Sequence, residues 1–247
     1  MSKDILYAEE LSVSFDGFKA LDINHFELIE GELRVIIGPN GAGKTTFMDV
    51  ICGKTKPDTG RVIMNGENLV KMKEKQIVDA GVGRKFQKPS IFPSLTVYEN
   101  FMLAIRMNRS VWKSLFYKTN KAHNARIQEV ARIVGLSDSM EKTAAYLSHG
   151  QKQWLEIGIV LIQDPKLLLI DEPAAGMTDE ETHKTGELLM SLAGTHTIIV
   201  IEHDMEFVRQ IAKTVTVLSE GKVLVEGPME QVQNDPRVIE CYLGSPE

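Results

Sequence analysis

The sequence predicts an α/β protein whose parallel sheet is covered by helices, and three observations lead to this prediction. Short apolar runs alternate with segments of helical periodicity along the 247 residues. Two of these runs, Leu167–Ile170 and Ile198–Ile201, are continuously apolar, which is typical of strands buried on both faces of a sheet. A glycine-rich stretch at 38–43 lies between an apolar run and a helical segment, as in a phosphate-binding loop.

The expected strands are short runs rich in apolar and β-branched residues. In chain order they are Ile5–Phe15, Asn24–Glu30, Leu33–Gly38, Arg61–Asn65, Val82–Phe86, Leu167–Asp171, Thr197–Glu202, Val215–Leu218 and Val223–Glu226. The expected helices carry apolar residues at helical spacing and are Lys44–Cys52, Thr96–Met107, Ala122–Val134, Gly150–Gln163, Asp179–Leu192 and Asp204–Ala212. Two helix starts carry a capping box, since Ser148 precedes Gln151 and Thr178 precedes Glu181 by three residues. We expect the tail, Met229–Leu243, to pack as a closing helix.

The length fits a single domain covering residues 1–247. From about Thr96 to Leu147 the pattern indicates helices and no strand, which predicts a helical lobe inserted into the α/β core. We place this lobe at about 96–164 and the core at about 1–95 and 165–247. Within the lobe, Arg106–Lys121 is basic and aromatic, so it is either a membrane-surface segment or a solvated loop with a small aromatic cluster.

Composition argues against several classes of protein. The chain has 28 Lys and Arg against 34 Asp and Glu, and its formal net charge of −6 disfavours binding to bare nucleic acid. No apolar run approaches the roughly 20 residues that span a bilayer, and the N-terminus does not resemble a signal peptide. Cys52 and Cys241 lie far apart without a Cys-x-x-Cys pair, so we expect a reduced cytoplasmic protein without a zinc site.

The glycine-rich stretch is the strongest chemical signal. It consists of Gly38, Pro39, Asn40, Gly41, Ala42, Gly43, Lys44 and Thr45, followed by Thr46. Glycines let the backbone turn so that its N–H groups and the helix N-terminus hold phosphate oxygens. Lys44 is then expected to reach the β- and γ-phosphates, and the Thr45 hydroxyl to ligate Mg²⁺. The alternative is a glycine-rich turn that matches the pattern by chance.

The second signal is an apolar strand that ends in two carboxylates, Leu167–Glu172. Such a position lies at the carboxyl edge of the sheet, where ligands bind in α/β folds. We expect Asp171 to hold Mg²⁺ and Glu172 to polarise the attacking water as a general base. The alternative is that both acids cap the turn before Pro173.

The third signal is the stretch Leu147-Ser-His-Gly-Gln151. Together the three motifs resemble the ATP-binding cassette (ABC) family, whose hallmark is Leu-Ser-Gly-Gly-Gln, over the whole chain. The resemblance implies an ABC ATPase core of the P-loop NTPase fold, with an antiparallel β subdomain and an inserted α-helical lobe. It also implies Mg²⁺-dependent ATP hydrolysis by two chains packed head to tail. In that pair, the ATP of one chain faces the signature residues of the other, which are Ser148, His149, Gly150 and Gln151.

The same resemblance gives roles to three isolated residues. Phe15 matches the aromatic that stacks on adenine, with Phe18 as a rival and a plain strand residue as the alternative. Gln87 matches the glutamine that senses Mg²⁺ and the γ-phosphate and links to the membrane partner; otherwise it is a surface turn residue. His203 matches the switch histidine at the γ-phosphate, which makes it a catalytic candidate beside Glu172; otherwise it is a helix-start histidine.

Two residues depart from the family pattern. His149 replaces the first glycine of the Gly-Gly pair, and its imidazole either sits beside the phosphate or points away. Thr178 replaces the aspartate that usually ends the loop after the catalytic glutamate. Communication between the two chains of a pair would then use a hydroxyl in place of a carboxylate.

Within this family, a single phosphate loop argues against a tandem protein, and the lack of a long heptad arm argues against a repair-type ATPase. We therefore expect a separate ATPase subunit of an importer. Gly83–Gln87 and Glu172–Met177 resemble the branched-chain amino acid and amide importers, while Leu147–Glu156, Gly176–Glu181 and Val232–Glu240 resemble the urea importer most. The implied partners are integral membrane permease subunits, a second identical or different ATP-binding subunit and, indirectly, a periplasmic solute-binding protein. The implied location is the cytoplasmic face of the cell membrane. The alternatives are a branched-chain amino acid importer ATPase, a regulatory ABC ATPase and a P-loop kinase.

Overall fold

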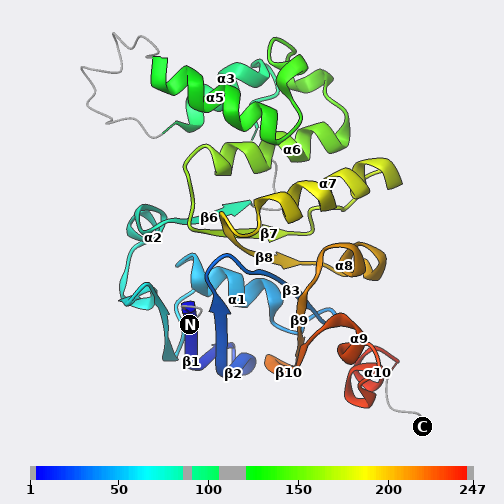
Figure 1. Ribbon diagram of the computed structural model, residues 1–247. Helices are drawn as coiled ribbons and strands as arrows, with labels where there is room; N and C mark the ends of the chain where they lie inside the picture. The colour runs from blue at the N-terminus through cyan, green and yellow to red at the C-terminus, as the bar shows by residue number, and fades with distance from the viewer. Residues whose placement is uncertain (1–3, 86–90, 106–120, 244–247) are drawn as a thin grey trace.

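The computed structural model describes residues 4–85, 91–105 and 121–243. They form two sheets and a group of helices beyond the larger one (Figure 1). The smaller sheet has the strand order β2-β1-β4-β5, with antiparallel neighbours throughout. Its strands are β1 (Asp4–Phe15), β2 (Phe18–Ile29), β4 (Thr59–Met64) and β5 (Glu67–Asn68).

The larger sheet has the strand order β10-β9-β3-β8-β7-β6, with parallel neighbours except for β9 and β10. Its strands are β3 (Leu33–Ile37), β6 (Val82–Lys85), β7 (Leu167–Asp171), β8 (Thr197–Ile201), β9 (Thr214–Ser219) and β10 (Lys222–Gly227). Every residue of β3, β7 and β8 is buried, in agreement with their continuous apolar sequences. The loops that follow these parallel strands therefore meet at one edge of the sheet.

Helices connect most of these strands. They are α1 (Lys44–Ile51), α2 (Glu74–Ala80), α3 (Val97–Ala104), α5 (Lys121–Ile133), α6 (His149–Leu161), α7 (Asp179–Leu192), α8 (Met205–Ile211), α9 (Met229–Val232) and α10 (Pro236–Leu243). Three short 3-10 turns are η1 (Leu69–Lys71), η2 (Ser137–Ser139) and η3 (Ala144–Tyr146). Within the described ranges, none of the helices combines the length and the apolar character needed to cross a membrane.

Alternate residues of the central strands face two separate apolar cores. Leu168 and Ile170 of β7 contribute to the core shared with α3, α5 and α6, and Phe101 of α3 is fully buried there. Leu167 and Leu169 contribute to the core shared with α1 and the smaller sheet. Figure 1 shows α3, α5 and α6 together at one end of the molecule and the smaller sheet at the other. The larger sheet therefore lies between the core that it shares with α3, α5 and α6 and the core that it shares with α1 and the smaller sheet.

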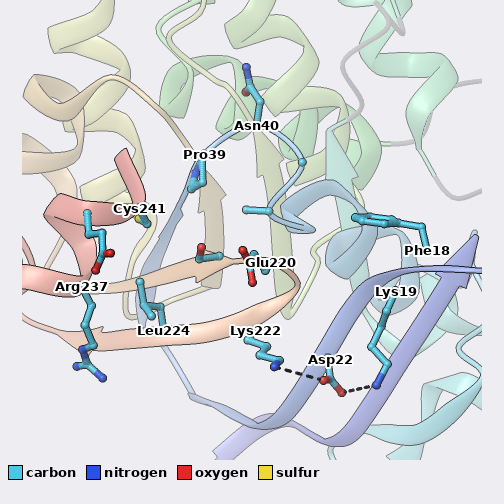
Figure 2. A pocket seen from close by; sticks show the side chains of 14 residues that line it. Phe18, Lys19, Asp22, Pro39, Asn40, Glu220, Lys222, Leu224, Arg237 and Cys241 are labelled. Atoms are coloured by element: carbon cyan, nitrogen blue, oxygen red, sulfur yellow. Dashed lines mark hydrogen bonds and ion pairs between the residues drawn. The ribbon is translucent and has the colours of Figure 1, made fainter. Parts of the chain in front are cut away.

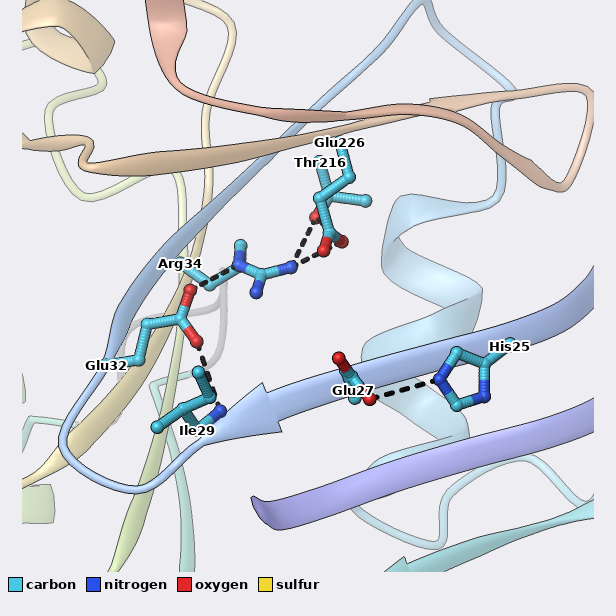
Figure 3. A network of polar contacts seen from close by, with 7 residues as sticks. All are labelled: His25, Glu27, Ile29, Glu32, Arg34, Thr216 and Glu226. Atoms are coloured by element: carbon cyan, nitrogen blue, oxygen red, sulfur yellow. Dashed lines mark hydrogen bonds and ion pairs between the residues drawn. The ribbon is translucent and has the colours of Figure 1, made fainter. Parts of the chain in front are cut away.

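A buried arginine near the start of β3 links this strand to β9 and β10. Arg34 is 3% exposed, and its guanidinium donates to Glu32 at 2.6 Å and to Thr216 of β9 at 3.0 Å (Figure 3). It also pairs with Glu226 of β10 at 2.5 Å and lies 5.6 Å from the centre of the Phe26 ring. Because the charge is paired and hydrogen-bonded, it can be buried at this place in the fold.

The predicted α/β fold with a parallel sheet, an antiparallel subdomain and a helical lobe is confirmed. β7 and α7 have the predicted bounds, but β2 begins at Phe18 instead of Asn24. The reason is the two-residue turn of Asp16 and Gly17, whose positive φ angles of 49° and 83° let Phe18 pair with Phe15.

Other predictions need correction in the last third of the chain and near α2. The tail forms the two helices α9 and α10 instead of one closing helix, because Pro236 lacks the N–H that would continue α9 and starts α10 instead. The helix α2 was not expected, since Ile77 is its single buried residue and leaves no apolar period. The predicted element ends Phe86 and Met107, and residues 106–120 of the basic and aromatic segment, lie outside the described residues.

Candidate functional site

The glycine-rich loop joins the end of β3 to the start of α1. Gly38 and Gly43 have φ angles of 152° and 93°. A Cβ atom would lie 2.1 Å from the Leu218 carbonyl oxygen at Gly38 and 2.6 Å from the Ala20 carbonyl oxygen at Gly43. Both positions therefore require glycine, and the loop is held in place by two neighbouring segments of backbone.

Lys44 folds back onto the loop that it follows. Its Nζ donates hydrogen bonds to the carbonyl oxygens of Gly38 at 2.6 Å and of Pro39 at 2.9 Å. Burial lowers the pKa of this amine, while the carboxylates of Glu172 and Asp171 raise it. The ammonium group thus lies inside the loop, in reach of an anion that the loop would hold.

Asp171 ends β7 and is 2% exposed. Neither of its buried carboxylate oxygens has a hydrogen-bond partner, and the nearest cation atom paired with it is Nη2 of Arg84 at 3.8 Å. Burial raises the pKa of this carboxyl, and Arg84 acts in the opposite direction. A buried carboxylate with unmet hydrogen-bonding capacity is chemically suited to a cation.

Glu172 and His203 come together across the edge of the sheet. Glu172 has a φ of 48° and is fixed by its N–H, which donates to the Ile201 carbonyl oxygen at 2.9 Å. Its Oε1 lies 3.5 Å from Nδ1 of His203, and both side chains are partly open to solvent. The two residues expected to be catalytic are therefore neighbours, on the loops that follow β7 and β8.

A further carboxylate, Glu202, was not singled out in the sequence. It is 1% exposed and accepts hydrogen bonds from the backbone N–H groups of Ala174 at 3.1 Å and His203 at 3.0 Å. Burial is the main cause that raises its pKa. Glu202 ties the loop after β7 to the loop after β8, and its place at the end of a predicted apolar strand was the available signal.

These residues fit a phosphate group with a divalent cation. The start of α1 has no side-chain cap, so its first N–H groups are available to an anion. Thr45 lies exposed in the first turn of α1. Among the described residues, no group of three or more His, Cys, Asp or Glu side chains could hold a metal on its own. A cation held by Asp171 and Thr45 would therefore complete its shell with phosphate oxygens, as Mg²⁺ commonly does.

A cleft of about 950 Å³ adjoins the loop (Figure 2). Its lining includes Pro39 and Asn40 of the loop, Phe18 of β2, Leu224 of β10 and Cys241 of α10. Phe18 is 68% exposed and faces this cleft, whereas its strand partner, Phe15, is not among the lining residues. Of the two aromatic candidates for stacking on adenine, Phe18 has the position beside the loop, and the role of Phe15 stays a prediction.

The stretch Ser148–Gln151 forms the start of α6. Ser148 is the N-cap and its oxygen accepts from the Gln151 N–H at 3.1 Å, while Gln151 Oε1 accepts from the Ser148 N–H at 3.1 Å. The predicted capping box is confirmed. The Ser148 hydroxyl and the Gly150 N–H also donate to Oε1 of Glu181, at 2.7 Å and 3.2 Å.

His149 turns toward its own chain. Its Nε2 lies 3.0 Å from the carbonyl oxygen of Ala175, in the loop that follows Glu172. Thr178 begins α7 as an N-cap, and its hydroxyl accepts from the Glu181 N–H at 3.3 Å, so this capping box is also confirmed. The two departures from the family pattern thus lie on one surface, where the start of α6 meets the segment that leads into α7.

Two charged contacts near the site were not foreseen. The guanidinium of Arg84 on β6 pairs with Asp49 of α1 and lies near Asp171. Lys85 pairs with Glu156 of α6 at 3.5 Å, with side chains 3% and 5% exposed. Such pairs join residues far apart in the sequence, which gives no local signal. Gln87, expected to sense Mg²⁺ and γ-phosphate, lies outside the described residues.

The comparisons with family models and with curated proteins point in the same direction. Residues 21–175 match the model described as ABC transporter, and residues 222–247 match that of the branched-chain amino acid ATP-binding cassette transporter. The high-affinity branched-chain amino acid transport ATP-binding protein LivG of Escherichia coli (strain K12) is 34% identical, with 99% of each chain covered. The corresponding protein BraF of Pseudomonas aeruginosa is 33% identical, also with 99% of each chain covered.

Solved structures are similar over nearly the full length. A nucleotide-free ATP-binding cassette from an ABC transporter has a TM-score of 0.86 and 31% identity, covering 98% of this chain and all of that one. The ADP conformation of an ATP-binding cassette of an ABC transporter gives a TM-score of 0.87 and 31% identity, covering 99% of this chain and 100% of that chain. The loop, the strand-end carboxylates and the α6 turn therefore lie in a fold that binds nucleotide in its relatives.

Proposed function

The chain belongs to the ABC transporter family, as an ATP-binding protein of the branched-chain amino acid transporter type, and we propose that it energises an importer through a site built by 38–46, Asp171, Glu172 and His203. It is an ATPase whose hydrolysis is coupled to transport. The observation that carries the site assignment is that Lys44 of the glycine-rich loop lies within the electrostatic reach of Asp171, whose oxygens lack a hydrogen-bond partner, and of Glu172, which pairs with His203. At one edge of the sheet these groups supply hydrogen-bond donors for phosphate, oxygen ligands for a cation and a general base.

Each residue has a proposed task in this site. Lys44 and the backbone N–H groups of the loop hold the β- and γ-phosphates. Asp171 and Thr45 hold Mg²⁺, which neutralises phosphate charge when it is bound, and Gln87 is proposed to contact it as well. Glu172 accepts the proton of the attacking water, and His203 donates a hydrogen bond toward the γ-phosphate.

The test of this assignment is the Lys44→Ala variant. Its amine bonds only to carbonyls of its own loop among the contacts described, so the fold should survive while ATP binding measured by calorimetry is lost. Lys54→Ala is the matched control, since Lys54 is an exposed lysine that pairs with Asp49 at 3.5 Å. Lys44→Ala binding ATP as tightly as Lys54→Ala would remove Lys44 from the site.

We propose a branched-chain amino acid as the transported substrate. The relatives named above favour this alternative over the urea importer, which rests on sequence resemblance in 147–156, 176–181 and 232–240 alone. Uptake of labelled leucine and of labelled urea, with and without this subunit in its intact transporter, separates the two. Loss of leucine uptake alone supports the proposal, and loss of urea uptake alone replaces it.

The proposed partners are permease subunits in the membrane and a second ATP-binding subunit. Hydrolysis coupled to transport needs a path across the membrane, and no helix among the described residues of this chain could provide one. We place the chain at the cytoplasmic face of the cell membrane, with a periplasmic solute-binding protein as an indirect partner. Co-purification with membrane subunits would support this arrangement over a regulatory ATPase.

A further inference from the structure

The start of α6 already holds an anion that belongs to the chain itself. Glu181 Oε1 accepts from the Ser148 hydroxyl at 2.7 Å and from the Gly150 N–H at 3.2 Å. Its other oxygen, Oε2, accepts from the Thr178 N–H at 3.2 Å, at the start of α7. One carboxylate thus links the first turns of two helices that lie about thirty residues apart in the sequence.

The space for this carboxylate is provided by a glycine. A Cβ atom at Gly150 would lie 2.5 Å from the carboxyl carbon of Glu181 and 2.6 Å from its Oε1. Any larger residue at position 150 would push the carboxylate away from α6. The hydrogen bond from Ser148 is the leading cause that lowers the pKa of Glu181, so the group is ionised at neutral pH.

We infer that Glu181 is a resident substitute for the terminal phosphate of the partner chain's ATP, and that this phosphate must displace it before two chains close. The inference rests on the proposed function and on the head-to-tail pairing that the resemblance to ABC ATPases implies, in which Ser148 and Gly150 face that ATP. The Ser148 hydroxyl and the Gly150 N–H have one hydrogen each, and both are donated to Glu181, so a second anion cannot share them without strong repulsion. Glu181 therefore sets the ATP concentration at which the signature residues bind the partner's phosphate.

The loop after Glu172 moves with this exchange. His149, between the two donors, contacts the carbonyl oxygen of Ala175 at 3.0 Å, and Thr178 is held by Glu181 itself. Release of Glu181 from α6 removes two of the contacts between α6 and the segment 174–181. Binding of the partner's phosphate thereby changes the contacts of the loop that carries the general base, Glu172.

The test replaces the charge and keeps the fold. Glu181→Gln retains the capping box of α7, since Gln serves at that position as well as Glu. Glu180→Gln is the matched control: it removes the same charge one residue away, where the carboxylate pairs with Lys184 at 2.6 Å on the surface. The measurements are ATP hydrolysis against ATP concentration in the full chain, and binding of a fluorescent ATP analogue to the dilute monomer.

Glu181→Gln should lower the ATP concentration for half-maximal hydrolysis by about tenfold, because a charged competitor is replaced by a neutral one. Analogue binding to the monomer should not change, since the chain's own loop is untouched. Glu180→Gln should match the wild type in both measurements. An unchanged or raised half-maximal concentration in Glu181→Gln overturns the inference. Failure of the wild type to bind the analogue in a Lys44-dependent way would instead overturn the proposed function, and this inference with it.

Discussion

Glu172 has a backbone conformation that residues other than glycine rarely adopt, with φ at 48°. The strain is held by the hydrogen bond from its N–H to Ile201, at 2.9 Å. As a result the side chain leaves the end of β7 toward His203, 3.5 Å away. A carboxylate in this place can accept a proton from water, whereas an amide of the same shape is a far weaker base.

We therefore expect Glu172→Gln to bind ATP normally and to hydrolyse it on the order of 10²–10⁴-fold more slowly. Phosphate release and calorimetric ATP binding are the two measurements. Glu206→Gln is the control, because Glu206 is an exposed carboxylate at the start of α8. Hydrolysis by Glu172→Gln at the rate of this control would show that Glu172 is not the base.

Glu202 gives a prediction for the effect of pH on stability. Burial raises the pKa of this carboxyl above its usual value of 4.5, so the folded state takes up its proton before the unfolded state does. As the pH falls through the folded pKa toward 4.5, the wild type should gain stability relative to Glu202→Gln, which has no such proton. Chemical denaturation of both proteins across this range measures the difference. A difference that does not vary with pH would contradict the burial of an ionised carboxylate.

At the scale of elements, the pair of Lys85 and Glu156 connects the core to the lobe. Lys85 ends β6, Glu156 lies in α6, and their side chains are 3% and 5% exposed. Removal of one partner leaves the other charge buried, which costs about 3–5 kcal/mol. Glu156→Ala should therefore lower the free energy of unfolding by that amount, measured by denaturant titration.

The comparison for this prediction is the exposed carboxylate Glu180, whose removal in Glu180→Ala should leave the free energy of unfolding nearly unchanged. The double variant Lys85→Met with Glu156→Leu should recover most of the loss, because no buried charge remains. A Glu156→Ala protein as stable as Glu180→Ala would show that the pair does not hold α6 on the sheet.

Elements with a strong local pattern could be predicted from the sequence, and contacts between distant elements could not. β7 and α7 were predicted to the residue, because one is continuously apolar and the other begins with a capping box. The first half of β2 was missed, although the Asp16-Gly17 turn is a hairpin signal. In the site, the loop and Asp171 follow from local motifs. The place of Glu181 against Gly150 depends on how α7 packs on α6, for which the sequence gives no local signal.

At the scale of the whole molecule, the residues expected to bind phosphate and the signature residues lie in different parts of the chain. Lys44 and the strand-end carboxylates lie at the edge of the larger sheet, while Ser148 begins α6 in the helical lobe. Among the contacts described, the Ser148 side chain bonds to Gln151 and to Glu181 of its own chain, and not to the glycine-rich loop. We therefore expect one chain to supply the glycine-rich loop of one site and the signature residues of another.

Hydrolysis of ATP by a mixture of two inactive variants tests whether the site is shared between two chains in this way. Lys44→Ala lacks a working loop and Ser148→Arg lacks a working signature turn, so each should be inactive alone. In an equal mixture, dimers with one chain of each kind have one intact site, and hydrolysis should recover to about a quarter of the wild-type rate. A mixture as inactive as its components, under conditions in which the wild type hydrolyses ATP, would contradict the composite site.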